Sequence, residues 1–301
     1  MKKIFKTLLL VLVAMIWGTA FVAQSSGMKY VGPFTYNCVR MLLGGIVLIP
    51  VIAFIDSKKT KETLTLEKNN KKIQILGGIC CGIALCVSSM FQQFGVKYTT
   101  VGKASFITAM YIVIVPVLSI FLKKHVSKLT AISVVVAVIG FYLLCLSGND
   151  SLAKGDLLVL ICAFGFSIHI IVIDYFSPLV DCVKMSCMQF LVGGVLAGIA
   201  MFIFEKPAWS DIWACRLEIG YAGIMSCGVA YTLQIVAQKD VNPTIASLLM
   251  SLESVFGAIA GYIILGEAFT GRQVIGCIII FTAVILAQLN IPEKKQEDIN
   301  I

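Results

Sequence analysis

The sequence predicts an all-α membrane protein with ten transmembrane helices arranged as two inverted five-helix repeats. Three observations lead to this fold class. The 301 residues are 59% hydrophobic and only 13% charged, which exceeds the apolar share of a soluble domain. The apolar residues form ten runs, each long enough to cross roughly 30 Å of hydrocarbon as a helix. Finally, one residue pattern occurs twice.

The repeated pattern relates the two halves of the chain. Residues 38–45 (CVRMLLGG) return 149 residues later as CMQFLVGG, and Gln92 returns 142 residues later as Gln234. Each half carries five apolar runs, an odd number, so the two copies must cross the bilayer in opposite directions. We expect repeats at 1–148 and 149–292, followed by a cytoplasmic tail at 293–301.

Charged and turn residues bound the expected helices. Pro33 and Pro243 stand where proline is tolerated, in the first turn, and Asn242 is a suitable N-cap. Pro116 falls inside the fourth run, where it should kink the helix. The expected ranges are 5–25, 33–55, 73–95, 100–122, 129–147, 156–175, 182–204, 217–238, 243–265 and 271–290.

The basic residues predict the orientation. If the N-terminus is cytoplasmic, the inner segments hold sixteen lysines and the outer segments hold seven lysines and arginines. By the positive-inside rule, both termini lie in the cytoplasm, and we expect the plasma membrane as the location. The net charge of +8 is then an orientation signal, and no nucleic-acid partner is expected.

The first run follows Lys2, Lys3 and Lys6 and could be read as a secretory signal. Its residues Trp17 and Phe21 have counterparts in the sixth run, so we expect it to be retained as a helix.

The eleven cysteines fall in or beside apolar runs, without a CxxC pair, and are interpreted as packing residues. Neither a metal nor a cofactor is predicted. The GxxxG pairs indicate close helix packing and assign no oligomeric state.

Chemistry is expected from polar residues placed where hydrocarbon penalises them. Glu253 lies about ten residues into the ninth run, close to the membrane midplane, with small or flexible residues on the same face. It is the main candidate to bind a proton or a cationic group in a cavity. The alternative is a hydrogen-bonded glutamate that ties helices together.

Arg40 and His169 are further candidates within the membrane. Arg40 lies about seven residues into the second run, where it could contact substrate or extend to the interface, and Gln189 takes its place in the second repeat. His169 could carry a proton, because the pKa of histidine lies near physiological pH. The alternative is a neutral, hydrogen-bonded packing residue, which is the more frequent role of a lone histidine.

Four more residues complete the candidate site. Gln92 and Gln234 offer amide donors and acceptors to a polar ligand, or hydrogen bonds between helices. Trp17 and Tyr111 fall near mid-depth instead of at the interfaces, so they could form walls around a ligand or pack in the core. All seven candidates are predictions for substrate binding or coupling.

Several short motifs follow one another along the chain. They are IWGTAFV at 16–22, PFT at 33–35 leading to Arg40, GKASFITAMY at 102–111, NPTIASLL at 242–249, LESVF at 252–256 and LGE at 265–267. Their order resembles the ten-helix EamA branch of the drug/metabolite transporter superfamily. Two departures are Leu122-Lys123-Lys124-His125, where that family often has an acidic residue, and Ser254, where it often has proline.

The resemblance implies a carrier of small organic solutes, often an exporter, with a central cavity between the halves. We therefore expect alternating-access secondary transport of a small metabolite such as an amino acid, with possible proton coupling. The alternatives are efflux of cationic or aromatic drugs, and a non-transporting membrane scaffold or sensor. The sequence holds no GxSxG or HExxH motif, so an intramembrane enzyme is not expected.

Overall fold

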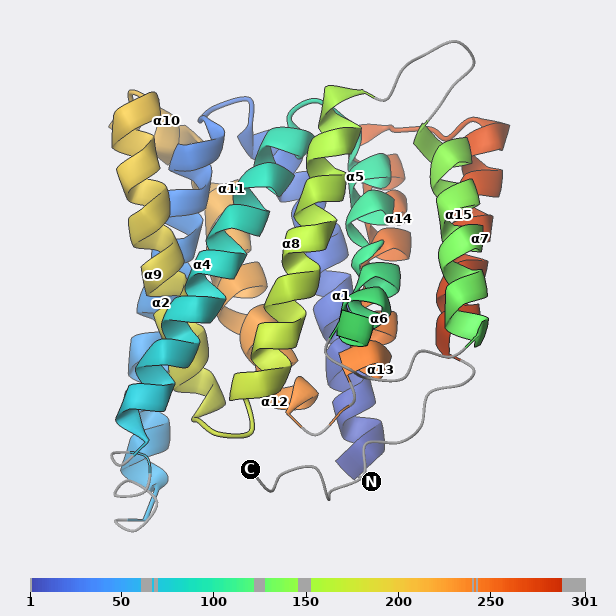
Figure 1. The fold of residues 1–301 in the computed structure, drawn as a ribbon. Helices are drawn as coiled ribbons and strands as arrows, with labels where there is room; N and C mark the ends of the chain where they lie inside the picture. The colour runs from blue at the N-terminus through green and yellow to red at the C-terminus, as the bar shows by residue number, and fades with distance from the viewer. Residues whose placement is uncertain are drawn as a thin grey trace.

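Nearly all of the described chain is helical. The computed structural model describes residues 2–60, 67, 70–121, 128–145, 153–239, 241 and 243–288, and no strand occurs among them. The helices, labelled as in Figure 1, are α1 (Lys2–Gly27), α2 (Pro33–Lys58), α4 (Lys71–Val96), α5 (Val101–Thr108), α6 (Tyr111–Phe121), α7 (Lys128–Cys145), α8 (Lys154–Phe176), α9 (Cys182–Phe204), α10 (Trp209–Ala214), α11 (Arg216–Gly220), the π-helix η1 (Tyr221–Tyr231), α12 (Thr232–Gln238), α13 (Pro243–Ser251), α14 (Glu253–Leu265) and α15 (Gly271–Gln288).

The outside of the bundle is apolar, and polar residues lie inside it. Phe202 is 76% exposed and Ile263 is 71% exposed, whereas Gln93 is fully buried. Seven stretches of the described residues are long and apolar enough to cross a membrane, and three further apolar helical stretches are shorter. A bilayer offers no hydrogen bonds, so this distribution suits a lipid surround. The helical class predicted from the sequence is confirmed.

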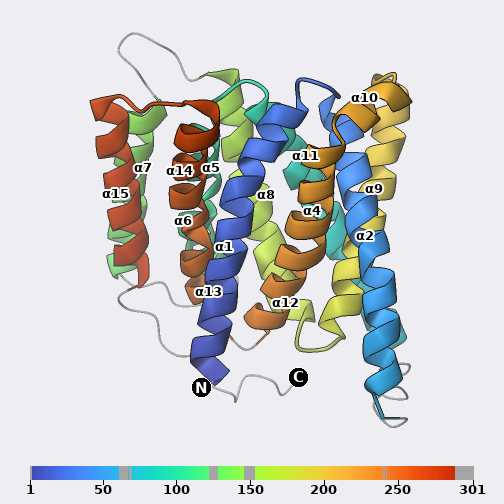
Figure 2. The same cartoon turned by 180° about the vertical axis from the view of Figure 1, so that it is seen from behind.

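Helices from the two halves of the chain pack against one another throughout the bundle. At one edge α7 packs against α15, and at the other α2 packs against α9 (Figures 1 and 2). Between these pairs, α4 packs against α8 and α1 packs against α14. The halves therefore share one interior. The predicted boundary at 148/149, the tail at 293–301, the N-cap Asn242 and the turn at 122–125 lie outside the described residues.

Two predicted helices are interrupted near their middle. The range 100–122 was expected to be one helix kinked at Pro116, but the interruption lies at Ala109 and Met110, and Pro116 sits inside α6. The amides of Ile112 and Val113 donate to carbonyls three residues back, at 3.1 and 3.0 Å, so the turn is tighter than an α-helix. The range 243–265 is likewise interrupted, at Leu252.

The expected helix at 217–238 is also not a regular α-helix. It begins in α11, continues as the π-helix η1, Tyr221–Tyr231, and ends in α12, and the short α10 precedes α11. Hydrogen bonds of the i→i+5 type change which side chains share a face, so α-helical spacing fails to predict the inward residues of this segment. The expected first-turn position of Pro33, in contrast, is confirmed at the start of α2.

Two loop carboxylates cap helices of the first half. Glu205, after α9, accepts hydrogen bonds from the amides of Phe34 and Thr35 at 3.0 and 2.8 Å. Glu267, after α14, accepts from the first two amides of α5 at 2.9 and 3.0 Å. The first amides of a helix have no partner within it and attract negative charge. Each carboxylate therefore ties a loop of the second half to a helix of the first.

A close contact between glycines sets the spacing of α1 and α14. A Cβ atom on Gly18 would lie 2.5 Å from the Cβ of Phe256 and 2.8 Å from the carbonyl oxygen of Glu253. On the α5 side of α14, a Cβ on Gly257 would lie 2.6 Å from the Cβ of Ser105. Only glycine fits at these positions. The contact brings Trp17, next to Gly18, close to the start of α14.

Candidate functional site

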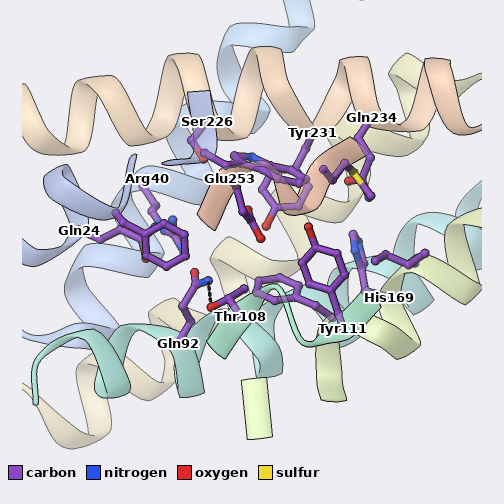
Figure 3. Close-up of a pocket in the computed structure, with 15 residues that line it drawn as sticks. Gln24, Arg40, Gln92, Thr108, Tyr111, His169, Ser226, Tyr231, Gln234 and Glu253 are labelled. Carbon is purple, nitrogen blue, oxygen red and sulfur yellow. Dashed lines mark hydrogen bonds between the residues drawn. The ribbon is translucent and has the colours of Figure 1, made fainter. Parts of the chain in front are cut away.

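The interrupted helices and the close packing of α1 form a cavity in the middle of the bundle (Figure 3). All seven candidates predicted from the sequence line it, although their roles in binding stay predictions. The lining residues are Trp17, Phe21, Gln24, Arg40, Gln92, Thr108, Tyr111, Phe166, His169, Ile170, Ser226, Tyr231, Gln234, Met250 and Glu253.

Many lining residues form pairs that the internal repeat makes equivalent. Both halves of the chain contribute one member of each pair, because the pairs are separated by the repeat offsets of 149 or 142 residues. The site therefore lies between the two halves. The pairs are Trp17 with Phe166, Phe21 with Ile170, Gln92 with Gln234, Thr108 with Met250, and Tyr111 with Glu253.

Glu253 is the acidic residue of this cavity. It is the first residue of α14, where the helix dipole favours a carboxylate, and it is 3% exposed. Its Oε1 atom has no hydrogen-bond partner among the described residues, and neither has the hydroxyl of Tyr111. Figure 3 shows the two side chains directed into the same space. A buried polar atom without a partner is costly, so both atoms are available to a ligand.

Arg40 enters the cavity from α2 and is 3% exposed. Its Nε donates to Asn37 Oδ1 at 2.8 Å, and the Asn37 amide donates to the Ser89 carbonyl at 3.1 Å. Its guanidinium carbon lies 5.7 Å from the centre of the Tyr36 ring. These contacts hold the side chain in the interior, so extension to the interface is not what the structure shows. Arg40 and Glu253, both described, form no ion pair with each other.

His169 is fixed by a neighbour on the next helix of the same half, α9. Its Nε2 lies 3.0 Å from Oε1 of Gln189, the residue that replaces Arg40 in the repeat. Its ring lies edge-on to Tyr231, with 6.0 Å between ring centres. These contacts agree with the packing alternative for this histidine, while its place on the cavity leaves a binding role open.

The two glutamines differ in what they leave for a ligand. The Gln92 amide donates to the hydroxyl of Thr108 at 3.4 Å. The Gln234 amide donates to Gln238 at 3.3 Å, and Gln234 Oε1 has no partner within the described part of the chain. Gln24 Oε1 is also buried and has no hydrogen-bond partner among the described residues. The interior thus holds several unused acceptors.

Aromatic rings form the wall beside Glu253. The rings of Trp17 and Tyr231 are 4.6 Å apart and tilted by 54°. The indole Nε1 of Trp17 is buried without a hydrogen-bond partner among the described residues. Together with Tyr111, these rings give the cavity an apolar surface and a few polar atoms, as is usual in small-molecule sites.

Comparison with known protein families identifies the family to which the chain with this site belongs. The profile of the EamA-like transporter family matches residues 4–146 and again 153–289, which is nearly the whole chain. The chain belongs to the EamA-like transporter family. The match to the drug/metabolite transporter superfamily predicted from the sequence is thereby confirmed. With its apolar spans, this EamA-family chain is an integral membrane protein.

Individual relatives agree with the family. An uncharacterized transporter of Archaeoglobus fulgidus is 30% identical over 299 residues, covering 96% of this chain and 88% of the relative. The threonine/homoserine exporter RhtA of Salmonella typhimurium is 31% identical over 114 residues, covering 36% and 39%. A solved crystal structure shares the fold with a TM-score of 0.67 at 19% identity, covering 94% of this chain and 96% of that one.

Sequence reasoning missed several lining residues of this EamA-family site. Phe21 and Gln24 lie one and two turns along α1 from Trp17, and Thr108 lies about one turn before Tyr111, so helical spacing could have found them. Ser226 and Tyr231 lie in η1, where the π-helical turn removes that signal.

The cavity is small in this conformation. It encloses about 30 Å³, which is room for one or two water molecules. Pockets for organic ligands are about ten times larger, on the order of 300 Å³ or more. In this conformation the cavity is therefore too small to hold an organic solute. Among the described residues, no group of His, Cys, Asp and Glu could hold a metal ion.

Proposed function

We propose that this chain is a secondary active transporter that exports small organic metabolites such as amino acids by alternating access. The observation that carries the proposal is Glu253, a buried carboxylate at a helix start, whose Oε1 atom is unpaired among the described residues and borders a cavity lined from both halves. An ionisable group in the membrane interior is expensive, so its place on a cavity supports a role in transport.

The architecture that we propose is ten transmembrane helices in two inverted repeats, residues 1–148 and 149–292, with a cytoplasmic tail at 293–301. Three features support it. The equivalent spans are interrupted at equivalent places, just before Tyr111 and just before Glu253. The cavity is lined by repeat-equivalent pairs. In Figure 1, α1 starts at the lower end of the bundle and α8 starts at the upper end. Discontinuous helices at a repeat interface are typical of transporter binding sites.

The substrate chemistry follows from the two charged residues of the cavity. Arg40 and Glu253 both line it and form no ion pair with each other. An amino acid carries one ammonium and one carboxylate, so Glu253 would bind the first and Arg40 the second, with Gln92 and Gln234 contacting polar atoms. Trp17, Tyr111 and Tyr231 would pack against the carbon skeleton. A relative named as a threonine/homoserine exporter supports this substrate class.

We propose that Glu253 exchanges the substrate ammonium for a proton, which would couple export to the proton gradient. His169 is a second candidate for proton binding. The transporter would lie in the plasma membrane with both termini in the cytoplasm, as the lysine distribution indicates. No enzymatic activity and no cofactor enter the proposal.

A second candidate function is efflux of cationic or aromatic drugs. The observation that favours it is the ring wall beside Glu253, where Trp17 and Tyr231 lie 4.6 Å apart, because aromatic faces and a carboxylate together attract organic cations. A non-transporting scaffold or sensor is a third reading, and solute flux in reconstituted vesicles separates it from both carriers.

Proteoliposome transport with an imposed pH gradient tests the proposal. A thermal-shift screen against amino acids, nucleobases, polyamines and quaternary ammonium compounds first identifies a ligand, because ligand binding to the folded state raises its stability. Wild-type flux should depend on the gradient, and Glu253→Gln should abolish that dependence. Glu218→Gln, which changes a carboxylate outside the cavity, is the control. Gradient-independent wild-type flux, or unchanged coupling in Glu253→Gln, would overturn the proton role.

A further inference from the structure

A second, larger hollow lies at the opposite end of the bundle from the two capping glutamates. It is a groove between the lower ends of α2, α4 and α9, which pack against one another (Figure 1). Its volume is about 380 Å³, more than ten times that of the central cavity. We call it the lower groove. It is lined by Ile52, Glu67, Lys71, Gln74, Ile75, Lys184, Cys187 and Met188.

The lining of the lower groove changes from polar to apolar along the helices. On α4, Lys71 is the first residue and Ile75 follows one turn deeper, about 6 Å along the axis. On α9, Lys184 lies in the first turn and Met188 follows one turn deeper. Polar groups thus lie at the helix ends, where the membrane surface would be, and apolar groups lie toward the hydrocarbon. A phospholipid has the same arrangement of headgroup and acyl chain.

The lower groove is open toward the surroundings of the bundle. Ile75, which lines it, is 38% exposed, and its neighbour Leu76 is 54% exposed. On α2, Ile49 lies one turn before Ile52 and is 51% exposed. Because these apolar surfaces belong to spans that face lipid, an acyl chain can reach the groove sideways from the bilayer.

The lysine ammonium groups in and beside the lower groove differ in whether a carboxylate neutralises them. Lys184 is 2.8 Å from an oxygen of Asp56 and 2.7 Å from an oxygen of Glu67, so neighbouring carboxylates neutralise it. Lys59 likewise contacts three carboxylates, those of Asp56, Glu67 and Asp181. Lys71 is exposed, and no described residue forms an ion pair with it.

Lys71 is therefore the cation of the groove that remains available to an anion. We propose that the lower groove binds one phospholipid with an anionic headgroup, whose phosphate contacts Lys71 and whose acyl chain packs on Ile75 and Met188. The proposal is independent of the substrate site, since no residue is shared between the two hollows. Basic pockets between membrane helices are suited to anionic lipids.

Native mass spectrometry of the purified, delipidated full chain tests the proposal. The probes are dioleoyl phosphatidylglycerol, which is anionic, and dioleoyl phosphatidylcholine, which is zwitterionic, at equal concentrations. Wild-type protein should retain one phosphatidylglycerol in preference to phosphatidylcholine. Lys71→Gln should lower the phosphatidylglycerol adduct by about fivefold, the effect of one lysine at a charged membrane surface.

Two further variants separate the parts of the site. Lys97→Gln removes an exposed lysine from the upper end of α4 and should leave the adduct unchanged. Ile75→Trp fills the apolar part and should lower the binding of both lipids. The unfolding temperature of each variant in detergent confirms that it is folded, and Lys71→Met replaces Lys71→Gln if that variant does not fold.

Three outcomes would overturn the proposal. Equal retention of the two lipids would exclude headgroup selection, and equal adducts in wild type and Lys71→Gln would exclude the named contact. Loss of the phosphatidylglycerol adduct on adding millimolar inorganic phosphate would show a phosphate site without a lipid requirement. Transport assays are not needed for any of these results.

Discussion

Tyr111 and Glu253 occupy equivalent positions in the two halves and face the same cavity. Each is the first residue after an interruption, Tyr111 at the start of α6 and Glu253 at the start of α14. The repeat offset of 142 residues separates them, and both line the central cavity. The scaffold is therefore duplicated at this point while the chemistry is not, because one copy carries a phenol and the other a carboxylate.

Tyr111→Phe should weaken transport more than it affects stability. The hydroxyl has no hydrogen-bond partner among the described residues, so its removal should change the unfolding free energy by only about 0.5 kcal/mol. If the hydroxyl contacts substrate, KM should rise about tenfold, which is the loss of one hydrogen bond. Flux and thermal unfolding measure the two effects. Tyr142→Phe, an exposed site on α7, is the control. A lower unfolding temperature with unchanged KM would favour a packing role.

Glu205→Gln should destabilise the upper end of the bundle. The carboxylate accepts both the Phe34 and Thr35 amides and the Thr35 hydroxyl, which lies 2.6 Å away. A glutamine has one acceptor atom and no charge to favour the helix start, so we expect a loss of about 1–2 kcal/mol. Thermal unfolding in detergent measures it. Asp211→Asn, at an exposed site of α10, should have little effect. Equal stability of Glu205→Gln and wild type would show that the cap is dispensable.

Gly18→Ala should force α1 away from α14. The added Cβ would lie 2.5 Å from the Phe256 Cβ and 2.7 Å from the Gly257 nitrogen, and neither backbone can yield without moving its helix. We expect a loss of about 1–3 kcal/mol, as for other overpacked sites, measured by thermal unfolding. Gly220→Ala is the matched control, because nothing lies within 4 Å of its added Cβ. That variant should be neutral or slightly stabilised. A Gly18→Ala variant as stable as the wild type would show that α1 and α14 can move apart at little cost in free energy.

The ion cluster around Lys59 should make stability fall at high pH. Burial disfavours the ammonium, but hydrogen bonds to Asp181, Glu67 and Asp56 outweigh it and raise the pKa of Lys59 above its ordinary value. Because the folded pKa is the higher one, the stabilisation is complete below the unfolded pKa of about 10.4 and declines as pH rises above it.

Thermal unfolding of wild type and Lys59→Met between about pH 7 and pH 11.5 measures this contribution. The wild type should be more stable at neutral pH, and the difference between the two proteins should shrink only at the alkaline end. Lys97→Met, an exposed lysine of the upper end, should show no such change. A difference that is already lost between pH 7 and pH 9 would contradict the raised pKa.

The sequence could predict which ionisable residues lie in the interior, while their roles in transport stay predictions. Glu253, Arg40 and His169 were selected because lipid penalises ionisable groups, so they must face the interior wherever the helices lie. All three line the cavity. Their partners could not be predicted, because the hydrogen bond between His169 and Gln189 joins two helices whose contact depends on the whole bundle. The repeat indicated that these positions are equivalent but not how close they are.

The sequence by itself determined the helical class, the places of the apolar spans and the equivalence of the two halves, because these follow from hydrophobic runs and from repeated residues. Only the tertiary structure decided where the helices are interrupted, that Tyr221–Tyr231 is π-helical, and that Glu205 and Glu267 cap α2 and α5. The caps join residues more than 160 positions apart in the chain. Such features depend on which backbone groups have no hydrogen-bond partner once the helices are packed together. Local residue patterns do not contain that information.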